Sequence, residues 1–269
     1  MLILLSPAKD LSAEVPSTIK GATQPVLLKE CVPIITKLRT LSTKKLGALM
    51  DLSPKLAQLN HQRNQAWSLP FTAQNARPAV FAFNGEVYHG LGPRTWDTED
   101  LRFAQQHLRI LSGLYGVLRP LDLMQDHRLM MGTRLGVGRA KDLYTYWGDR
   151  ISEVLKKDLA ASGGYAVVNL ASSEYLKAVR PKILGARVIT PVFKVKQGNT
   201  YKVVMVFAKH QRGAMARHII QHRILDVDAL RSYEGDGYRF SREDSTADEW
   251  VFVQTDPHFT LRGRRASLR

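Results

Sequence analysis

Hydrophobic positions near the start of the chain predict one buried strand followed by a series of helices. Leu2–Leu5 is a continuous apolar run of the length typical of a strand inside a sheet. Leu27–Leu41 instead carries its apolar residues at helical spacing. Ser42 and Ser53 stand where helix N-caps belong, and Pro54 suits the first position of a helix. The N-terminal part is therefore expected to be mostly helical after its first strand.

Later in the chain the pattern becomes typical of strands. A helix is expected from a cap at Thr98 to Gly113, and another over Asp142–Leu159. Gln197–Asn199 has the composition of a hairpin turn. β-Branched and aromatic residues predict strands over Ala166–Leu170, Arg187–Val195, Tyr201–Ala208 and Trp250–Gln254. Helices are expected between these strands, over Ser172–Val179 and Gly213–Ile224.

These elements predict one compact domain of the α+β or α/β class, with a mixed β-sheet flanked by helices and a helical insertion. No linker rich in Gly, Ser or Pro and no internal repeat divides the sequence. We therefore expect a single domain over residues 1–255. Residues 256–269 are interpreted as a basic, flexible tail, because four arginines and no acidic residue occupy positions 261–269.

The excess of basic residues points to a partner that carries phosphates. The 269 residues include 39 Lys plus Arg and 24 Asp plus Glu, a formal net charge of +15. Residues 102–141 hold seven basic and two acidic residues, and residues 200–225 hold five basic residues, three histidines and no acid. Two such blocks within folded sequence favour a surface that meets phosphates. A purely solubilising role for the charge is the alternative.

Other features of the composition exclude whole classes of protein. A single cysteine, Cys31, excludes a disulfide framework and any all-cysteine zinc or iron–sulfur site within one chain. No apolar stretch reaches the roughly 18 residues of a membrane span, and the opening apolar run is too short for a signal peptide. We therefore expect a cytoplasmic protein with no membrane partner.

Two groups of basic residues follow predicted strands. Lys9 comes directly after the first strand, and the carboxyl ends of buried strands face the crevice in which α/β sheets hold ligands. Lys209 and Arg212 lie where a predicted strand passes into a helix, with Arg217 one turn later. A helix start offers unpaired backbone N–H groups to an anion. These four cations are candidate phosphate ligands, and a plain basic turn is the alternative at each place.

The segment Leu111–Val117, with the sequence LSGLYGV, is the most distinctive local motif. It predicts two helices that meet through a glycine turn, an arrangement that grips a DNA phosphate without reading a base. Arg109 and Arg119 would add positive charge on either side. A glycine turn that serves packing alone is the alternative. The residues expected to contact phosphate in this turn are Ser112, Gly113, Tyr115 and Gly116.

Other polar residues support further hypotheses. His218 and His222 are four residues apart and could share one helix face, but no third ligand is evident, so no metal site is predicted. Glu86, Glu174 and Tyr175 are candidate acid–base groups of an enzyme that acts on a nucleotide, nucleobase or phosphorylated metabolite in the same crevice. That enzyme is the alternative to a protein that binds DNA. No cofactor is predicted.

Several motifs occur together in one order along the chain. LILLSPAK opens the sequence, and QQHLR runs into LSGLYGVLRPLD over residues 105–122. MGTRL, YWG, NLAS and PVF then follow. In this combination the chain closely resembles the YaaA family of bacterial peroxide-stress proteins, over all but about the last twenty residues.

The resemblance implies a cytoplasmic protein that limits free intracellular iron during hydrogen peroxide stress, and so limits oxidative damage to DNA. It also implies that duplex DNA binds in a positively charged cleft, with a helix–hairpin–helix element in a single α/β domain. The hairpin maps to residues 112–116, and the cleft lysines map to Lys9 and Lys209. The chain departs from the family where AKHQRG stands in place of AKKARG, so His210 would make one cleft charge depend on pH.

Overall fold

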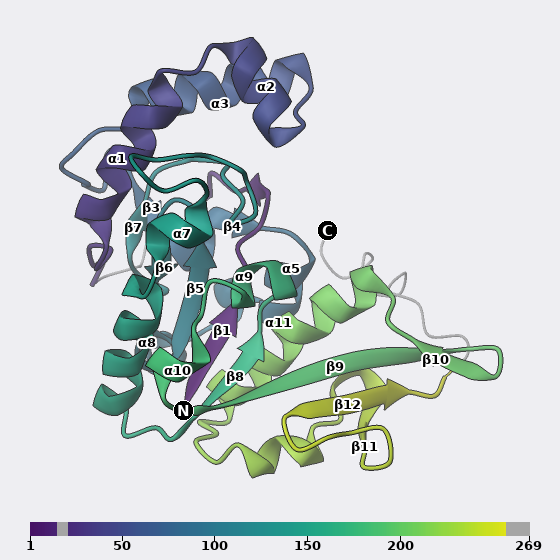
Figure 1. The fold of residues 1–269 in the computed structure, drawn as a ribbon. Helices are drawn as coiled ribbons and strands as arrows, with labels where there is room; N and C mark the ends of the chain where they lie inside the picture. Colours follow the sequence, from purple (N-terminus) through teal and green to yellow (C-terminus); the bar gives the residue numbers. More distant parts are fainter. Residues whose placement is uncertain (15–20, 257–269) are drawn as a thin grey trace.

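The strand Leu2–Leu5 (β1) forms the centre of the main sheet (Figure 1). The structure, a computed structural model, describes residues 1–14 and 21–256. β1 pairs in parallel with β5 (Leu108–Ser112) on one side and with β8 (Ala166–Leu170) on the other. All residues of these three strands are buried. Burial on both faces explains why β1 is a continuous apolar run rather than an alternating one.

The main sheet is mixed, as expected, and mostly parallel. From one edge to the other, its strands are β11 (Tyr238–Ser241), β12 (Glu249–Gln254), β9 (Arg187–Gln197), β8, β1, β5 and β6 (Gly116–Leu118). The neighbours from β12 to β5 are parallel, whereas β11 and β6 are antiparallel to theirs. β10 (Thr200–Lys202) forms a hairpin with the end of β9 across the predicted turn.

Half of the helices and 3-10 turns in the described part of the chain occur between β1 and β5 in the sequence, as the expected helical insertion requires. They are α1 (Leu28–Arg39), α2 (Thr43–Met50), α3 (Pro54–Ala66), α4 (Ala79–Ala82), α5 (Glu86–Leu91), the 3-10 turn η1 (Pro93–Thr95) and α6 (Thr98–His107). Ser42 and Ser53 cap α2 and α3 as predicted. Asp97, not Thr98, caps α6, because Asp97 and Asp100 form a reciprocal capping box.

The remaining helices follow β6. They are α7 (Leu143–Trp147), α8 (Arg150–Ala161), α9 (Ser173–Leu176), α10 (Pro181–Leu184), α11 (Met205–Gln221) and the 3-10 turns η2 (Asp228–Ser232) and η3 (Gly235–Gly237). The single helix expected over 142–159 is two helices, because the chain turns at Gly148, where φ is 53°. Within residues 1–14 and 21–256, no helix has the length and apolarity needed to cross a membrane.

Two short antiparallel pairs complete the fold. β2 (Asp10–Leu11) pairs with β4 (Phe83–Asn84), and β3 (Arg77–Pro78) pairs with β7 (Leu123–Met124). These pairs join the helical insertion to the segment after β1 and to the segment after β6.

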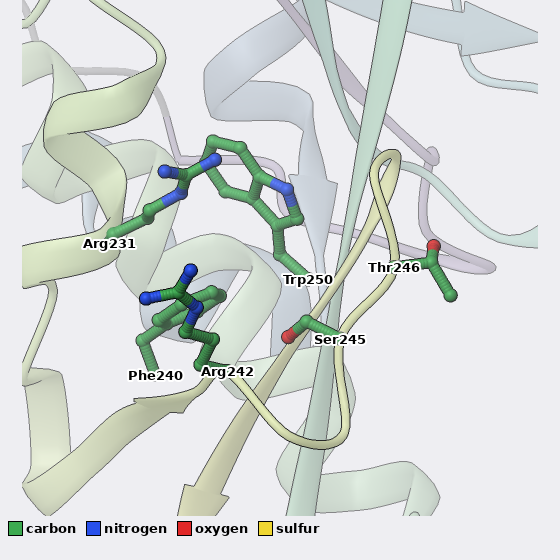
Figure 2. A pocket seen from close by; sticks show the side chains of 6 residues that line it. All are labelled: Arg231, Phe240, Arg242, Ser245, Thr246 and Trp250. Carbon is green, nitrogen blue, oxygen red and sulfur yellow. The ribbon is translucent and has the colours of Figure 1, made fainter.

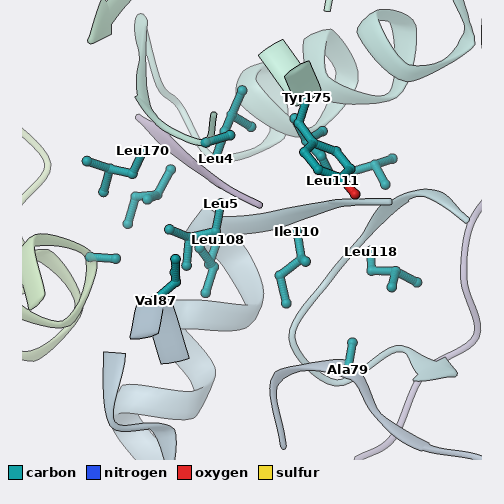
Figure 3. Close-up of a cluster of buried hydrophobic side chains, with 14 of the residues drawn as sticks. Leu4, Leu5, Ala79, Val87, Leu108, Ile110, Leu111, Leu118, Leu170 and Tyr175 are labelled. Atoms are coloured by element: carbon teal, nitrogen blue, oxygen red, sulfur yellow. The ribbon is translucent and has the colours of Figure 1, made fainter. Parts of the chain in front are cut away.

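One core joins the sheet to its helices. Leu4 and Leu5 of β1 and Ile110 of β5 lie in a buried cluster with Val87 of α5 (Figure 3). α11 packs against β1, β8 and β9, while α8 packs against β6 and α10. The chain is therefore a single mixed α/β domain. The predicted tail lies outside the described residues from position 257 onward, so the domain boundary at 255 stays a prediction.

Candidate functional site

The carboxyl ends of β1 and β8 lie side by side where the strand order of the sheet reverses. The chain first places β5 on one side of β1 and later returns to place β8 on the other, and open α/β sheets hold ligands at such a point. The backbone N–H of Ser172 donates to Ser6 Oγ over 2.8 Å. Asn169 Nδ2 donates to Thr190 Oγ1 over 3.3 Å. Hydroxyl and amide groups are thus gathered at this edge of the sheet.

Lys9 lies at the same edge. It is exposed, and it directly precedes β2, whose pairing with β4 brings it beside the start of α5. The two segments touch, because a Cβ built on Gly85 would lie 3.4 Å from the Cβ of Ala8. The first residue of α5 is Glu86. The end of β1 therefore brings a cation and a candidate acid–base group into one neighbourhood.

Glu86 stands between two histidines. Its Oε1 is 3.6 Å from Nδ1 of His89, and its Oε2 is 3.9 Å from Nδ1 of His210 on α11. The His210 side chain is 7% exposed, and its Nε2 lies 3.8 Å from Oδ2 of Asp236. Acidic and basic groups thus alternate in a row that leads from the surface inward.

Sequence reasoning missed two members of this row, His89 and Asp236. The spacing of Glu86 and His89 at i and i+3 was the signal available for the first, but no helix was predicted over these residues. No local signal existed for Asp236, because the tertiary fold alone brings η3 to α11.

Asp236 is held in place from the buried side. Its Oδ2 accepts a hydrogen bond from Gln211 Nε2, and Gln211 Oε1 accepts one from the Tyr233 hydroxyl over 2.8 Å. Gln254 Nε2 donates to the carbonyl oxygen of Asp236. The backbone φ of Asp236 is 55°, in the left-handed region, which non-glycine residues seldom adopt. The surroundings of Asp236 hold it in this conformation. The carboxylate is therefore fixed in direction.

Lys209 and Arg212 do not lie at a helix start, so that part of the prediction is wrong. β10 ends at Lys202 and α11 already begins at Met205, which places both residues well inside the helix. Their backbone N–H groups therefore serve helical hydrogen bonds and are not offered to an anion. The run of β-branched and aromatic residues before Lys209 favoured a strand, but tertiary packing against α5 outweighs that preference.

The side chains of the four predicted cations still remain available. Lys9 and Lys209 are exposed, and Arg212 and Arg217 are half-buried. Desolvation lowers the pKa of Arg212. Among the ion pairs of the described residues, none involves any of these four side chains. Their charges are therefore not neutralised by acidic neighbours within the described part of the chain.

The LSGLYGV segment forms a β-hairpin, so the predicted pair of helices at this place is wrong. Residues 108–112 are β5 and residues 116–118 are β6, paired antiparallel. The four turn residues expected to meet phosphate are all buried: Ser112, Gly113, Tyr115 and Gly116. The glycines serve packing, because a Cβ on Gly113 would lie 2.4 Å from the Leu129 carbonyl oxygen. Gly116 has a φ of 67°, and a Cβ there would lie 3.0 Å from the Trp147 ring.

His127 packs on this hairpin and makes stability depend on pH. Its ring lies 5.0 Å from that of Tyr115, and burial lowers its pKa to about 4. In the unfolded chain this histidine has an ordinary pKa of about 6.5. As the pH falls, the unfolded chain therefore binds a proton at this histidine before the folded protein does. We expect the free energy of unfolding to fall by about 3 kcal/mol between pH 7 and pH 4 through this residue. Urea unfolding at several pH values should show a shallower loss in His127→Gln, and an unchanged slope would contradict the assignment.

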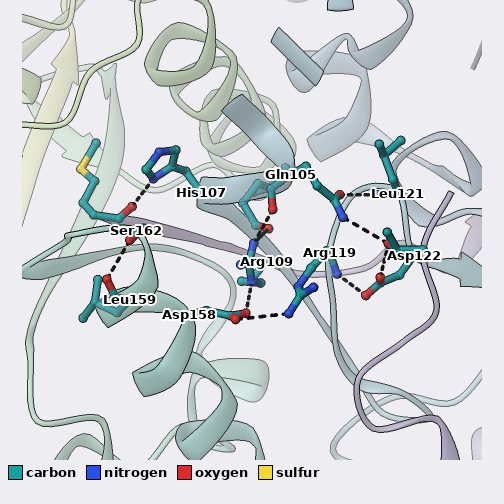
Figure 4. A network of polar contacts seen from close by, with 12 residues as sticks. Gln105, His107, Arg109, Arg119, Leu121, Asp122, Asp158, Leu159 and Ser162 are labelled. Carbon is teal, nitrogen blue, oxygen red and sulfur yellow. Dashed lines mark hydrogen bonds and ion pairs between the residues drawn. The ribbon is translucent and has the colours of Figure 1, made fainter. Parts of the chain in front are cut away.

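Arg109 and Arg119 share one carboxylate (Figure 4). Arg109 Nε donates to Asp158 Oδ2 over 2.5 Å, and Arg119 Nη2 lies 3.4 Å from Oδ1 of the same residue. The Arg109 side chain is only 4% exposed, and desolvation lowers its pKa. A duplex cannot reach a guanidinium at that depth, so Arg109 is a structural partner of α8 and not a surface contact.

Glu174 and Tyr175 are engaged elsewhere. Glu174 Oε1 accepts from the backbone N–H of Gly132 over 2.8 Å, and the buried Tyr175 hydroxyl is directed at Met130 Sδ, 4.0 Å away. Burial raises the pKa of Tyr175. Nothing within the described residues pairs Glu174 with Glu86. Of the three acid–base candidates, Glu86 is the one that lies within 4 Å of histidine side chains among the described residues.

His218 and His222, at the C-terminal end of α11, pack their rings against each other. The rings of His218 and His222 lie 4.3 Å apart, and His222 Nδ1 contacts the carbonyl oxygen of His218 over 3.0 Å. Over the described ranges, no group of three or more His, Cys, Asp or Glu side chains is arranged to hold a metal ion.

The helices α2 and α3 form a hairpin for which the sequence suggested no function. Three residues connect them, and the pair lies at the end of the molecule farthest from β11 and β12 (Figure 1). Lys44, Lys45 and Lys55 are exposed on it, and they take part in no ion pair with a described residue. Asp51 is the one acidic residue between positions 42 and 66. This hairpin is therefore a basic projection.

The chain was compared with protein families and with curated proteins. The family described as peroxide stress protein YaaA matches residues 1–244. A UPF0246 protein of Cupriavidus metallidurans is 50% identical over 255 residues, which cover 94% of this chain and 98% of the relative. Relatives of the same name from Ralstonia nicotianae and Saccharophagus degradans are 50% and 48% identical, over 94% of this chain and 98% and 99% of their own lengths. The chain therefore belongs to the peroxide stress protein YaaA family.

Proposed function

We propose that this peroxide stress protein binds duplex DNA in the cytoplasm, with little sequence preference, and limits free intracellular iron and oxidative DNA damage. The observation that carries the proposal is the α2–α3 hairpin, with three exposed lysines and no acidic partner among the described residues. Lysines on such a surface bind DNA through phosphates. The link to iron rests on the family alone.

We propose that the helix–hairpin–helix element is formed by α2 and α3, over residues 43–66, and not by residues 112–116. Ser53 caps the N-terminus of α3, a helix of 13 residues whose first turn carries Lys55. The positive end of its dipole favours a nearby phosphate, and the Lys55 side chain adds a charge at the same end. Such contacts carry no base information, which accords with binding that is not sequence-specific.

A second part of the DNA surface is proposed around the carboxyl end of β1. Lys9, Lys209, Arg212 and Arg217 supply four cations there, on the loop after β1 and on α11. We infer that they line the positively charged cleft that the family resemblance implies. His210 lies between Glu86 and Asp236, so its protonation would alter the charge of this surface.

DNA binding is tested with two matched triple variants. Lys44→Gln, Lys45→Gln and Lys55→Gln together remove the hairpin charge, and Lys156→Gln, Lys157→Gln and Lys182→Gln remove three exposed lysines elsewhere. For roughly five neutralised phosphates, the wild-type slope of log affinity against log salt should be near −4 to −5. The hairpin variant should flatten this slope by about 2 to 3 and bind at least tenfold more weakly at low salt.

The control variant should bind nearly as the wild type does. Equal losses in the two variants, or no binding of duplex by the wild type at low salt, would contradict the proposal.

The alternative function is an enzyme acting on a nucleotide, nucleobase or phosphorylated metabolite, and the placement of Glu86 between two histidines is the observation in its favour. In that case Lys9→Ala with Lys209→Ala would abolish turnover and leave DNA binding in place.

A further inference from the structure

A cavity of about 440 Å³ opens at the amino ends of β1 and β5, opposite the edge that carries Lys9. It lies between the end of α6, the start of β5 and the C-terminal end of α8. Its polar lining includes Gln106, His107, Arg109, Arg119, Asp158 and Ser162. Neither the DNA surface proposed above nor the alternative enzyme site uses this cavity.

Asp158 is committed mainly to Arg109. Arg109 donates to it over 2.5 Å from Nε and to the carbonyl oxygens of Gln105 and Leu108 from Nη1. These bonds fix the Arg109 guanidinium in the cavity floor. Arg119 reaches the other carboxylate oxygen only at 3.4 Å. The single carboxylate that lines the cavity is therefore shared unequally between two cations.

Arg119 is the cation left without full compensation. Its side chain is 34% exposed and lines the cavity, and its buried Nε has no hydrogen-bond acceptor among the described residues. Asp122 lies close to Arg119, but it accepts bonds from the Arg119 backbone N–H over 2.8 Å and from the Thr23 hydroxyl over 2.6 Å. Its carboxylate is thereby occupied by other donors.

The remaining polar groups of the cavity are mostly satisfied within the chain. Gln105 bonds the backbone N–H of Leu121 and the Thr23 hydroxyl, and Ser162 Oγ donates to the Leu159 carbonyl oxygen. His107 Nδ1 contacts the carbonyl oxygen of Met1 over 2.9 Å. What the protein leaves only partly matched is the guanidinium fork of Arg119, since its Nη2 has a single contact, of 3.4 Å, with Asp158 Oδ1. Such a fork binds the paired oxygens of a phosphate or carboxylate.

We propose that this cavity is a binding site for a small oxyanion, the phosphate or carboxylate group of a small molecule, with Arg119 as its main ligand and Arg109 as its floor. The depth of Arg109 suits a group that enters the cavity, and excludes a duplex backbone that remains outside. The site is separate from the α2–α3 hairpin and from the cations near Lys9, so it goes beyond the proposed DNA binding.

The experiment titrates inorganic phosphate, and separately succinate, into wild-type protein at low ionic strength by calorimetry. The comparison variants are Arg119→Gln and Arg242→Gln. Arg242 lines another cavity, of about 480 Å³, with Arg231, Phe240 and Trp250 (Figure 2), and so controls for the loss of one arginine charge. We expect saturable 1:1 binding, weakened at least tenfold in Arg119→Gln and unchanged in Arg242→Gln. Preference for phosphate or for succinate identifies the class of oxyanion.

His107 supplies an independent readout. Its pKa is lowered by desolvation and by the nearby Arg109 charge, so an anion in the cavity should raise it. Histidine NMR titration should show this rise in the wild type with saturating phosphate, and no rise in Arg119→Gln. Arg119→Lys, which keeps the charge but removes the fork, should bind with intermediate affinity even if the glutamine variant does not fold.

Equal binding by the two arginine variants, or binding without a change at His107, would overturn the proposal in favour of general surface attraction. Failure of the proposed DNA function can be distinguished from failure of this oxyanion site. The triple lysine variant of the α2–α3 hairpin should bind phosphate as the wild type does, whatever its affinity for duplex.

Discussion

Gly213→Ala is expected to destabilise the protein by about 3 kcal/mol or more, although it adds a single methyl group. α11 crosses α5 at this residue, and an added Cβ would lie 1.8 Å from the Val87 carbonyl oxygen and 2.7 Å from the Leu91 backbone nitrogen. Gly90 is the reciprocal contact on α5, where a Cβ would lie 2.1 Å from the His210 carbonyl oxygen. Backbone atoms cannot move aside as a flexible side chain can, so the helices must separate.

The measurement is urea unfolding, with Gly136→Ala as the control. An added Cβ at Gly136 would lie 3.4 Å from its nearest neighbour, an ordinary contact, and should change the free energy of unfolding by less than about 1 kcal/mol. Wild-type stability in Gly213→Ala would show that the helices do not approach as closely as described.

Asp158→Ala should cost about 3–5 kcal/mol, since it leaves the Arg109 charge buried without its partner. Removing both charges should be tolerated better than removing one. We therefore expect Arg109→Met with Asp158→Leu to recover most of the loss, because two apolar side chains of similar size replace the buried pair. Thermal or urea unfolding of the single and double variants measures both effects.

A surface ion pair provides the contrast. On α6, Arg102 Nη2 lies 2.6 Å from Glu99 Oε2, and both side chains are exposed. Glu99→Ala should therefore leave the unfolding midpoint close to that of the wild type. If Asp158→Ala behaved like Glu99→Ala, water would have to reach Arg109, contrary to its burial. If the double variant were no more stable than Asp158→Ala, the cost would come from packing rather than from the unpaired charge.

Local sequence was a reliable guide where one local signal dominated. The apolar run Leu2–Leu5 is the buried central strand, and Ser42 and Ser53 cap the helices expected after them. The turn at residues 197–199 joins β9 to β10, with Gly198 at a φ of 60°. In each case the signal lies within a few residues, because strand burial, capping and turn conformation are set by near neighbours.

Prediction failed where two structures share the same local signals. Glycines at 113 and 116 suit a turn between helices and a turn between strands equally well, and α6 passes directly into β5 without a connecting loop. Only burial of this segment against Trp147 and Leu129 selects the hairpin. On α11, residues with strand preference precede Lys209, yet the contact with α5 through Gly213 stabilises a helix.

The sequence by itself determined the mixed α/β class, the central strand, the capped helices α2 and α3, the basic composition and, through its motifs, the family. Only the tertiary structure decided which charges are available. It buries Arg109 against Asp158, 49 residues away, and leaves Lys44, Lys45 and Lys55 on a projecting hairpin. The physical reason is that secondary structure follows from near neighbours, whereas burial and charge compensation depend on contacts between distant segments.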